Sequence, residues 1–231
     1  MSPTTYLQDD SLLSEYKRLR KALPYLTSAL VKCLSKTAIM ECAKKLGFCK
    51  GKRLVFGSLQ EADVLMDYCI YSFRRGGKTA IQRYALNQPP PEGSDHDVLL
   101  KAMVRSYYSI FQVKDLERGR GLLLFDLFRT ENFSLLDIGL SSSAIRNSVF
   151  AGRVLPICGY YMTSGAFIPL GRELLGQTVI PMVERFSSRI NREADTVFSP
   201  PDEARFSMEI IRAALRKGML ERMTYADIGS E

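Results

Sequence analysis

Apolar side chains recur at helical spacing along most of the first half of the chain. Residues 10–23 place Tyr16 and four leucines on one side and Lys and Arg on the others, which predicts an amphipathic helix. Pro24 predicts the start of a second helix, because proline is favoured in a first helical turn. The same spacing predicts helices at about 36–46, 59–73 and 78–86, with a short strand at about 54–56.

The pattern changes after the break at residues 88–93. One more helix is expected there, with Ser94 as its N-cap. Beyond it the apolar period falls from about 3.6 to about 2, and five short strands are expected at 110–114, 122–128, 133–140, 149–157 and 160–169. Turn-like segments join them, so the sequence predicts a small antiparallel sheet or partly open barrel. Helices at 172–189 and 203–217 are expected to close the structure.

The predicted fold class is therefore α+β, in three regions. Residues 1–88 form a helical basic region, 94–190 a helix plus a small antiparallel β-domain with its closing helix, and 200–222 a C-terminal amphipathic helix. The chain has 231 residues, 46% hydrophobic and 25% charged, which are ordinary globular values. No apolar run is long enough for a membrane span. The first ten residues lack the pattern of a signal peptide, so a cytoplasmic location is expected.

Positive charge is concentrated at one end of the sequence. Residues 1–90 hold 15 Lys and Arg against 7 Asp and Glu, a net of +8, whereas 91–170 hold 8 against 8 and 171–231 hold 9 against 10. Such a region indicates nucleic acid, an acidic protein partner, or only solubility. The candidate nucleic-acid-binding residues are Lys17, Arg18, Arg20, Lys21, Lys44, Lys45, Lys50, Lys52 and Arg53. They would contact phosphates, and nothing in the sequence is placed to read base edges.

Residues 37–47 also resemble the first helix and turn of a helix-turn-helix. A second helix should follow within a few residues to enter the major groove. A basic turn and a strand-like segment follow instead, which leaves a winged-helix-like arrangement or a solvated basic face as the alternatives.

An enzyme that handles nucleotides or phosphates is the alternative function, centred on Lys78, Thr79 and Asp126. The segment Arg74-Arg-Gly-Gly-Lys-Thr79 ends like a phosphate-binding loop, but the first glycine of that motif would fall on Ser72. A phosphate loop also follows a strand, and the preceding segment is predicted to be a helix. A glycine helix stop is therefore the favoured interpretation.

Other enzyme chemistries have less support. Ser94-Asp-His-Asp97 is similar to the metal-binding strand of nucleotidyltransferases, but acidic residues in a first helical turn are also typical of capping. The Gly-Ser turn that such a site needs is missing upstream. Residues 141–143, three consecutive serines, are expected to form a loop. The single histidine, His96, leaves no evident base for a Ser or Cys nucleophile.

The cysteines argue against a metal site. The chain has five, without a C-x-x-C pair, and one histidine that is distant in sequence from all of them: Cys33, Cys42, Cys49, Cys69 and Cys158. Structural zinc needs closely spaced ligands. No metal and no cofactor are expected, and the cysteines are interpreted as small hydrophobic residues.

Residues from about 53 to 170 resemble an uncharacterised group of bacterial proteins with a helical region before a small β-sheet. The resemblance rests on Val98–Met103 in a helix, Tyr108–Val113 and Leu124–Leu127 in strands, and a glycine-containing pattern from Gly152 to Gly165. These motifs are structural, so the resemblance implies a fold and no known function. Some relatives carry a Cys-rich zinc tail, which this chain lacks at its C-terminus.

Together these patterns predict a non-enzymatic cytosolic binding or adaptor protein. Its partner is expected to be nucleic acid, bound without regard to sequence, or another protein in a larger assembly. No membrane partner is expected.

Overall fold

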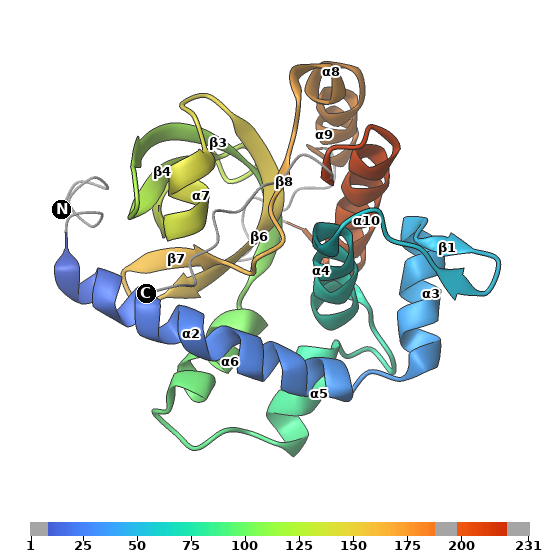
Figure 1. Cartoon of the computed structure of the whole chain (residues 1–231), viewed down its shortest axis with the longest axis horizontal. Helices are drawn as coiled ribbons and strands as arrows, with labels where there is room; N and C mark the ends of the chain where they lie inside the picture. The colour runs from blue at the N-terminus through green and yellow to red at the C-terminus, as the bar shows by residue number, and fades with distance from the viewer. Residues whose placement is uncertain (1–8, 188–197, 221–231) are drawn as a thin grey trace.

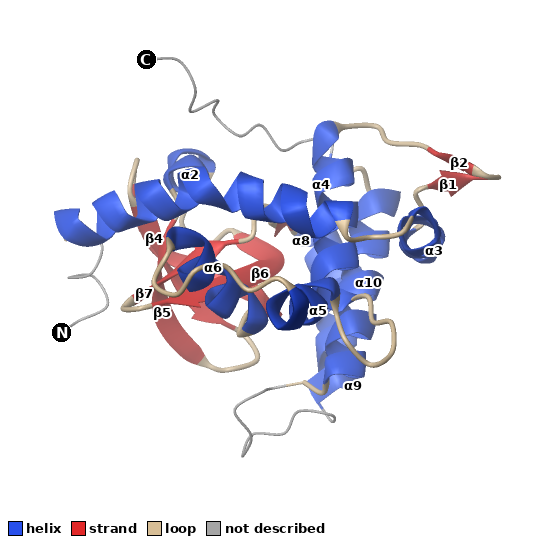
Figure 2. Ribbon diagram, turned by 90° about the horizontal axis from the view of Figure 1, so that it is seen from below, coloured by secondary structure: helices blue, strands red, loops and turns tan. Residues whose placement is uncertain are grey.

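The computed structural model describes residues 9–187 and 198–220, and its fold is α+β as predicted (Figures 1 and 2). The larger sheet lies in one half of the molecule and most of the later helices lie in the other. The longest helix, α2 (Asp10–Lys32), runs beside the strands and continues towards the helical half.

Short polar side chains begin most of the N-terminal helices, as the cap signals in the sequence suggest. Ser35, Ser58 and Ser94 each accept a hydrogen bond from a backbone N–H in the first turn of their helix. The elements are α3 (Lys36–Leu46), β1 (Cys49–Lys50), β2 (Arg53–Leu54), α4 (Leu59–Asp67), the π-helix η1 (Tyr68–Ser72), α5 (Ala80–Asn87) and α6 (Asp95–Val104).

The prediction of a helix boundary at Pro24 is wrong, because Pro24 lies inside the single helix α2. The buried residues of α2 follow one unbroken helical stripe on both sides of the proline: Tyr16, Leu19, Leu23, Leu26 and Leu30. Burial of this stripe outweighs the one backbone hydrogen bond that proline removes.

The strands form a partly closed, five-stranded barrel. They are β3 (Tyr107–Glu117), β4 (Gly121–Asp126), β5 (Glu131–Leu136), β6 (Val149–Ile157) and β7 (Tyr160–Thr163), with β8 (Ile168–Pro169) added beside β6. The order is β3-β4-β5-β7-β6, and β6 pairs with β3 to close the ring. Every pairing is antiparallel except that of β5 with β7, where Leu135 lies opposite Tyr161. The sequence analysis did not anticipate this parallel pair.

The predicted strands differ from the structure at several ends. The strand expected at 110–114 spans Tyr107–Glu117, and the one expected at 122–128 ends at Asp126. The strand expected at 133–140 stops at Leu136, because Asp137 caps the helix α7 (Ile138–Ser143) by accepting the N–H of Leu140 at 2.9 Å. The strand expected at 160–169 is two strands, β7 and β8, with Gly165 at φ 105° between them.

Aromatic rings fill the barrel. Phe111 and Phe167 stack with ring centroids 5.6 Å apart. A Cβ on Gly152 of β6 would lie 2.2 Å from the Phe167 ring. Only glycine leaves room for that ring at this position. The packing of the barrel core therefore explains why residue 152 is a glycine.

The C-terminal helices pack on the outside of the barrel. They are α8 (Arg172–Leu174), the π-helix η2 (Leu175–Val179), α9 (Ile180–Ser187) and α10 (Pro200–Arg216). Phe206 of α10 packs against Tyr108, Phe128, Phe186 and Phe198. The two predicted helices are therefore present. Residues 188 and 189 of the first predicted helix, and residues 221 and 222 of the third predicted region, lie outside the described part of the chain. The three-region division stays a prediction.

Candidate functional site

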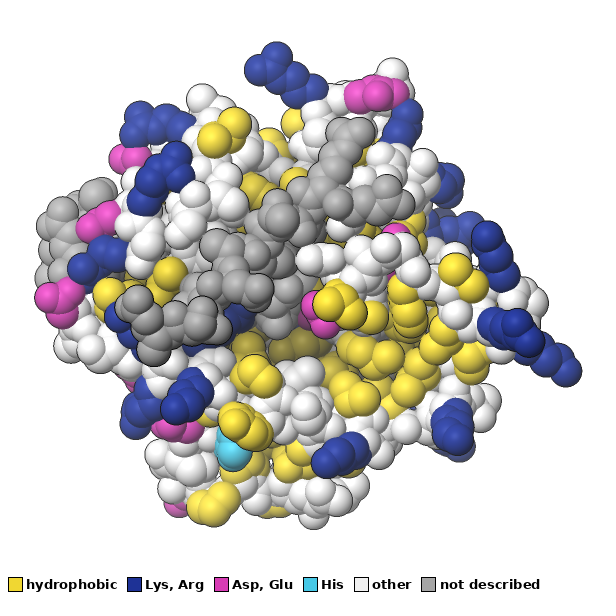
Figure 3. Space-filling view, in the orientation of Figure 1, with side chains coloured by type: hydrophobic (Ala, Val, Ile, Leu, Met, Phe, Trp, Pro, Cys, Tyr) yellow, Lys and Arg dark blue, Asp and Glu magenta, His cyan; other side chains and the backbone are white. Residues whose placement is uncertain are grey.

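Five of the nine candidate cations lie together at one end of the molecule. We call them the basic hairpin surface: Lys44, Lys45, Lys50, Lys52 and Arg53, all exposed. In Figure 3 dark-blue side chains mark this end, where Figure 1 shows the hairpin of β1 and β2.

Local backbone geometry builds this surface. Gly47, at φ 99°, ends α3 in the left-handed conformation, and the N–H of Phe48 bonds the carbonyl of Ala43 at 2.8 Å. Phe48 is then buried, which anchors the chain before the hairpin. Gly51, at φ 63°, makes the turn between β1 and β2. The hairpin thus projects its cations from a fixed base.

The charges of this surface are largely uncompensated. Lys45 forms an exposed ion pair with Glu41 at 2.8 Å, which contributes little to stability. Within residues 9–187 and 198–220, no carboxylate forms an ion pair with Lys44, Lys50, Lys52 or Arg53. The surface therefore presents a positive field that a polyanion would neutralise.

Apolar side chains lie directly beside these cations. Leu54, Val55 and Leu59 are 38%, 42% and 82% exposed. Figure 3 shows yellow side chains adjoining the blue end. A partner of this surface could therefore gain apolar contacts as well as neutralise charge.

The four cations of α2 do not join this surface. Lys17, Arg18 and Lys21 are exposed, and Arg18 pairs with Asp95 at 3.2 Å. They lie in the first half of α2, which runs beside the barrel in Figure 1, whereas the hairpin of β1 and β2 lies at the other end of the molecule. Arg20 was expected on the polar side of the helix, but it is turned towards the barrel and donates to the carbonyl oxygen of Thr163 at 2.9 Å.

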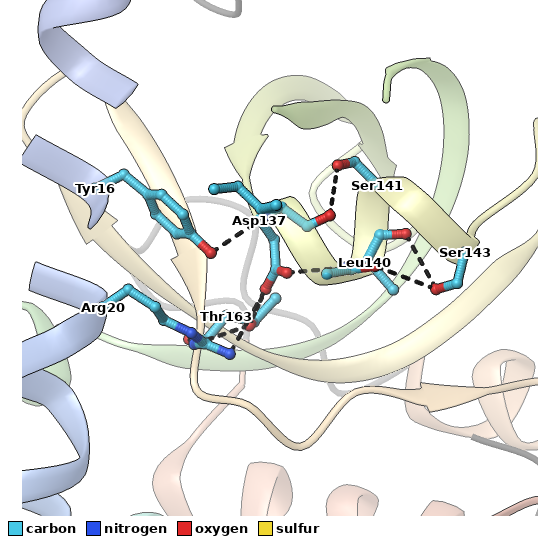
Figure 4. A network of polar contacts seen from close by, with 9 residues as sticks. Tyr16, Arg20, Asp137, Leu140, Ser141, Ser143 and Thr163 are labelled. Carbon is cyan, nitrogen blue, oxygen red and sulfur yellow. Dashed lines mark hydrogen bonds and ion pairs between the residues drawn. The ribbon is translucent and has the colours of Figure 1, made fainter. Parts of the chain in front are cut away.

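Arg20 belongs to a structural network that fastens α2 to the barrel (Figure 4). Asp137 accepts a hydrogen bond from the Thr163 hydroxyl at 2.5 Å and forms an ion pair with Arg20 at 3.9 Å. The N–H of Ile138 donates to the hydroxyl of Tyr16 at 3.3 Å. Burial, with a smaller contribution from Asp137, raises the pKa of Tyr16 to about 12. These groups satisfy one another, and their arrangement serves stability.

The same network explains the three serines at 141–143. They lie in α7 rather than in a loop, and Ser141 donates its hydroxyl to the carbonyl of Ile138 at 3.0 Å. Ser143 bonds the carbonyl of Gly139 at 3.3 Å. These hydroxyls back-bond to the helix, a common structural use of serine.

The glycine segment does not form a phosphate loop. It follows the π-helix η1 rather than a strand, and Arg75 and Lys78 exchange backbone hydrogen bonds at 3.0 and 3.3 Å across a tight turn. Thr79 caps α5 in a capping box with Gln82. Its hydroxyl is thus used to begin α5. The preceding helical segment already ends at Ser72, with Phe73 extended. Gly76 and Gly77 form the turn between Arg75 and Lys78, so the predicted glycine helix stop is wrong in this detail.

Asp126 lies elsewhere, at the end of β4, and Figure 1 shows β4 well away from α5. Its carboxylate accepts the Ser109 hydroxyl at 2.7 Å and the N–H groups of Phe128 and Arg129 at 2.9 and 3.1 Å. Burial raises the pKa of this carboxyl above its usual range. The structure therefore does not bring Lys78, Thr79 and Asp126 together.

Ser94 and Asp97 act as the capping interpretation expects. Ser94 accepts the N–H of Asp97 at 3.2 Å, and Asp97 accepts the N–H of Gly93 at 2.9 Å. Lys101 and that N–H lower the pKa of Asp97. In the part of the chain that the structure describes, no group of three or more His, Cys, Asp and Glu side chains could hold a metal ion.

Comparison with known proteins gives one match. The model of a family described as "Family of unknown function (DUF7986)" matches residues 10–195. The chain belongs to this family. No curated protein and no solved structure matches it. The match extends from α2 through α9, so the DUF7986 region includes both the basic hairpin surface and the barrel.

One buried charge of this DUF7986 chain was missed by the sequence analysis. Arg153 of β6 is 2% exposed and forms ion pairs with Asp67 at 3.7 Å and Glu203 at 2.8 Å. Its guanidinium also lies 4.8 Å from the ring centroid of Tyr71. The sequence did contain a signal for this site, an arginine in the middle of an otherwise apolar strand. A charged side chain at such a position is buried only when it has charged or polar partners, so acidic partners were to be expected.

Among the described helices of this DUF7986 protein, none combines the length and the apolar character that crossing a membrane requires.

Proposed function

We propose that this protein is a non-enzymatic binding protein that holds nucleic acid, without regard to base sequence, on the basic hairpin surface. The observation that carries the proposal is the gathering of five exposed cations, four of them without an ion pair among the described residues, on one projecting hairpin and the adjoining helix end.

Phosphate binding explains the features of this surface. Lys and Arg that contact phosphates release condensed counterions, which makes binding favourable and strongly salt-dependent. The β1–β2 hairpin has only two residues in each strand, so it offers no recognition helix to read bases in a groove. Binding independent of sequence follows from this combination.

The barrel supports the same class of ligand. A partly closed, five-stranded barrel is the architecture of oligonucleotide- and oligosaccharide-binding folds, whose ligands lie on an outer strand face. On the outer side here, the ammonium of Lys114 lies 5.0 Å from the ring centroid of the half-buried Phe125. A base could stack on such a pair, although this likeness is one of architecture only.

The test is a salt titration of binding to single-stranded and duplex DNA and RNA. The variant Lys50→Ala/Lys52→Ala/Arg53→Ala removes three cations from the hairpin. If each contacts a phosphate, the slope of log affinity against log salt for single strands should flatten by about 2, because each contact contributes about 0.7. The matched control, Lys17→Ala/Arg18→Ala/Lys21→Ala, removes the same charge from α2 and should leave the slope nearly unchanged.

Three outcomes contradict the proposal. Wild-type protein that binds no nucleic acid at low salt would leave an acidic protein partner as the role of the surface. An equal effect of the two triple variants would mean that net charge alone is responsible. Loss of binding in Phe125→Ala, with the hairpin variant unaffected, would move the site to the barrel. Bacterial origin and a cytoplasmic location remain part of the same proposal.

A further inference from the structure

A cavity of about 380 Å³ lies between α2, the junction of α4 with η1, and the loop that follows β7. This volume suits a small organic molecule. Leu23, Met66 and Ile70 give it apolar walls, whereas Asp63, Asp67 and Tyr71 add polar groups. The cavity is separate from the basic hairpin surface, whose residues do not line it.

Negative charge dominates the polar wall. Asp63 and Asp67 are one helical turn apart, so their side chains lie on the same face of α4. Asp67, whose side chain is 10% exposed, shares the single guanidinium of Arg153 with Glu203. Two carboxylates thus share one cation. Burial is the main cause that raises the pKa of both Asp63 and Asp67, which means that their charged forms lack sufficient partners and that a bound cation would stabilise them.

Arg20 is the one cation among the described residues that line the cavity, and it is already engaged. Its guanidinium donates to the carbonyl of Thr163 at 2.9 Å and pairs with Asp137 at 3.9 Å. It therefore holds α2 to the barrel, and the carboxylates of α4 keep their excess of negative charge.

Tyr71 supplies an independent sign of a ligand. It is 8% exposed and lines the cavity, and its hydroxyl forms no hydrogen bond with any residue that the structure describes. The hydroxyl oxygen is not among the buried side-chain atoms that lack a partner, so it is open to the cavity and available to a ligand. Tyr71 also lies in the π-helix η1, a type of segment that is frequent at functional sites.

We propose that this cavity binds a small primary aliphatic amine. The ammonium group lies between the carboxylates of Asp63 and Asp67, the hydrocarbon chain contacts the apolar walls, and the hydroxyl of Tyr71 gains a hydrogen bond. An anion would meet uncompensated carboxylates, and a neutral ligand would leave them unpaired, so charge selects the amine.

The test is isothermal titration calorimetry of the full chain with three probes of equal length: n-hexylamine, n-hexanol and hexanoate. We expect hexylamine to bind at least about tenfold more tightly than the other two, since a charged hydrogen bond contributes more than a neutral one. Asp63→Asn should weaken hexylamine about tenfold, and Tyr71→Phe about threefold. Asp63 is exposed, so its variant should fold normally.

The control is Glu184→Gln, which removes an exposed carboxylate of α9 that does not line the cavity. It should bind hexylamine as the wild type does. No binding of hexylamine by folded wild-type protein up to about 10 mM overturns the proposal. Equal binding of hexanol, or an Asp63→Asn variant with unchanged affinity, overturns it as well. None of these results bears on nucleic-acid binding.

Discussion

At the scale of residues, two aspartates mark the ends of barrel strands. Asp126 is the last residue of β4 and Asp137 follows β5, and the carboxylate of each accepts backbone N–H groups of the turn that comes next. Asp126 bonds the N–H groups of Phe128 and Arg129, and Asp137 bonds that of Leu140. Each also accepts a buried hydroxyl, from Ser109 and Thr163 respectively. A buried aspartate is easily taken for a catalytic residue. In both cases here its hydrogen bonds fix the direction of the chain after the strand.

Asp137→Ala should therefore be strongly destabilising. It removes the cap of α7 and leaves the Thr163 hydroxyl and the Leu140 N–H without their acceptor, so the free energy of unfolding should fall by about 3 kcal/mol. Urea denaturation measures this. Asp115→Ala is the control, because its ion pair with Arg146 is exposed, and it should cost less than about 0.5 kcal/mol. Similar losses in the two variants would contradict this role of Asp137.

At the scale of elements, α2 connects the two halves of the molecule. Its buried stripe packs in one cluster with residues of α6, η1, β6 and β7. Pro24 lies near the middle of this helix and removes its backbone hydrogen bond there. The helix persists because its neighbours hold it on both sides of the proline.

Pro24→Ala should stabilise the protein. Alanine restores the backbone donor, which stabilises a helix interior by up to about 3 kcal/mol relative to proline. It also gives the unfolded chain more conformational freedom, which costs about 1 kcal/mol. We expect a net gain of about 1–2 kcal/mol in urea denaturation. Pro91→Ala, in the exposed turn before α6, should change stability by less than about 0.5 kcal/mol. A loss of stability in Pro24→Ala would show that the ring packs too well in the cavity wall to be replaced.

At the scale of the whole molecule, local signals predicted elements, but the connections between them needed the structure. The helix at 36–46 ends at Gly47 as predicted, and the strand at 149–157 has the predicted bounds, because caps and alternation are local. The parallel contact of Leu135 with Tyr161 and the closure of β3 on β6 join distant segments, which periodicity does not encode.

The same limit applies to the candidate sites. Lysine and arginine content indicated a basic region. It did not indicate that Arg18 points to solvent whereas Arg20, two residues further along the same helix, joins the network at the barrel. Asp63 and Tyr71 carry no motif, and only the packing of α2 against α4 and η1 places them around one cavity. The basic hairpin surface was easier to anticipate because its five cations are close in sequence.

Phe206 tests whether the helical half and the barrel unfold together. It is fully buried in α10, contacts Tyr108 of β3 with ring centroids 6.2 Å apart, and belongs to a cluster that also includes residues of α3 and α4. Phe206→Ala should lower the free energy of unfolding by about 3–5 kcal/mol, the usual cost of removing a buried ring. Because the cluster spans both halves, the far-UV circular dichroism of the helices and the amide hydrogen-exchange protection of strands β3–β7 should be lost at the same lower urea concentration.

Leu59→Ala is the control for this variant, since Leu59 is 82% exposed, and it should cost less than about 0.5 kcal/mol. If the helical signal of Phe206→Ala shifted while the amides of strands β3–β7 kept their hydrogen-exchange protection, the barrel would hold its structure without α10. The helical and β regions would then be separate folding units. Coincident transitions would instead make the aromatic cluster around Phe206 the common core of one cooperative domain.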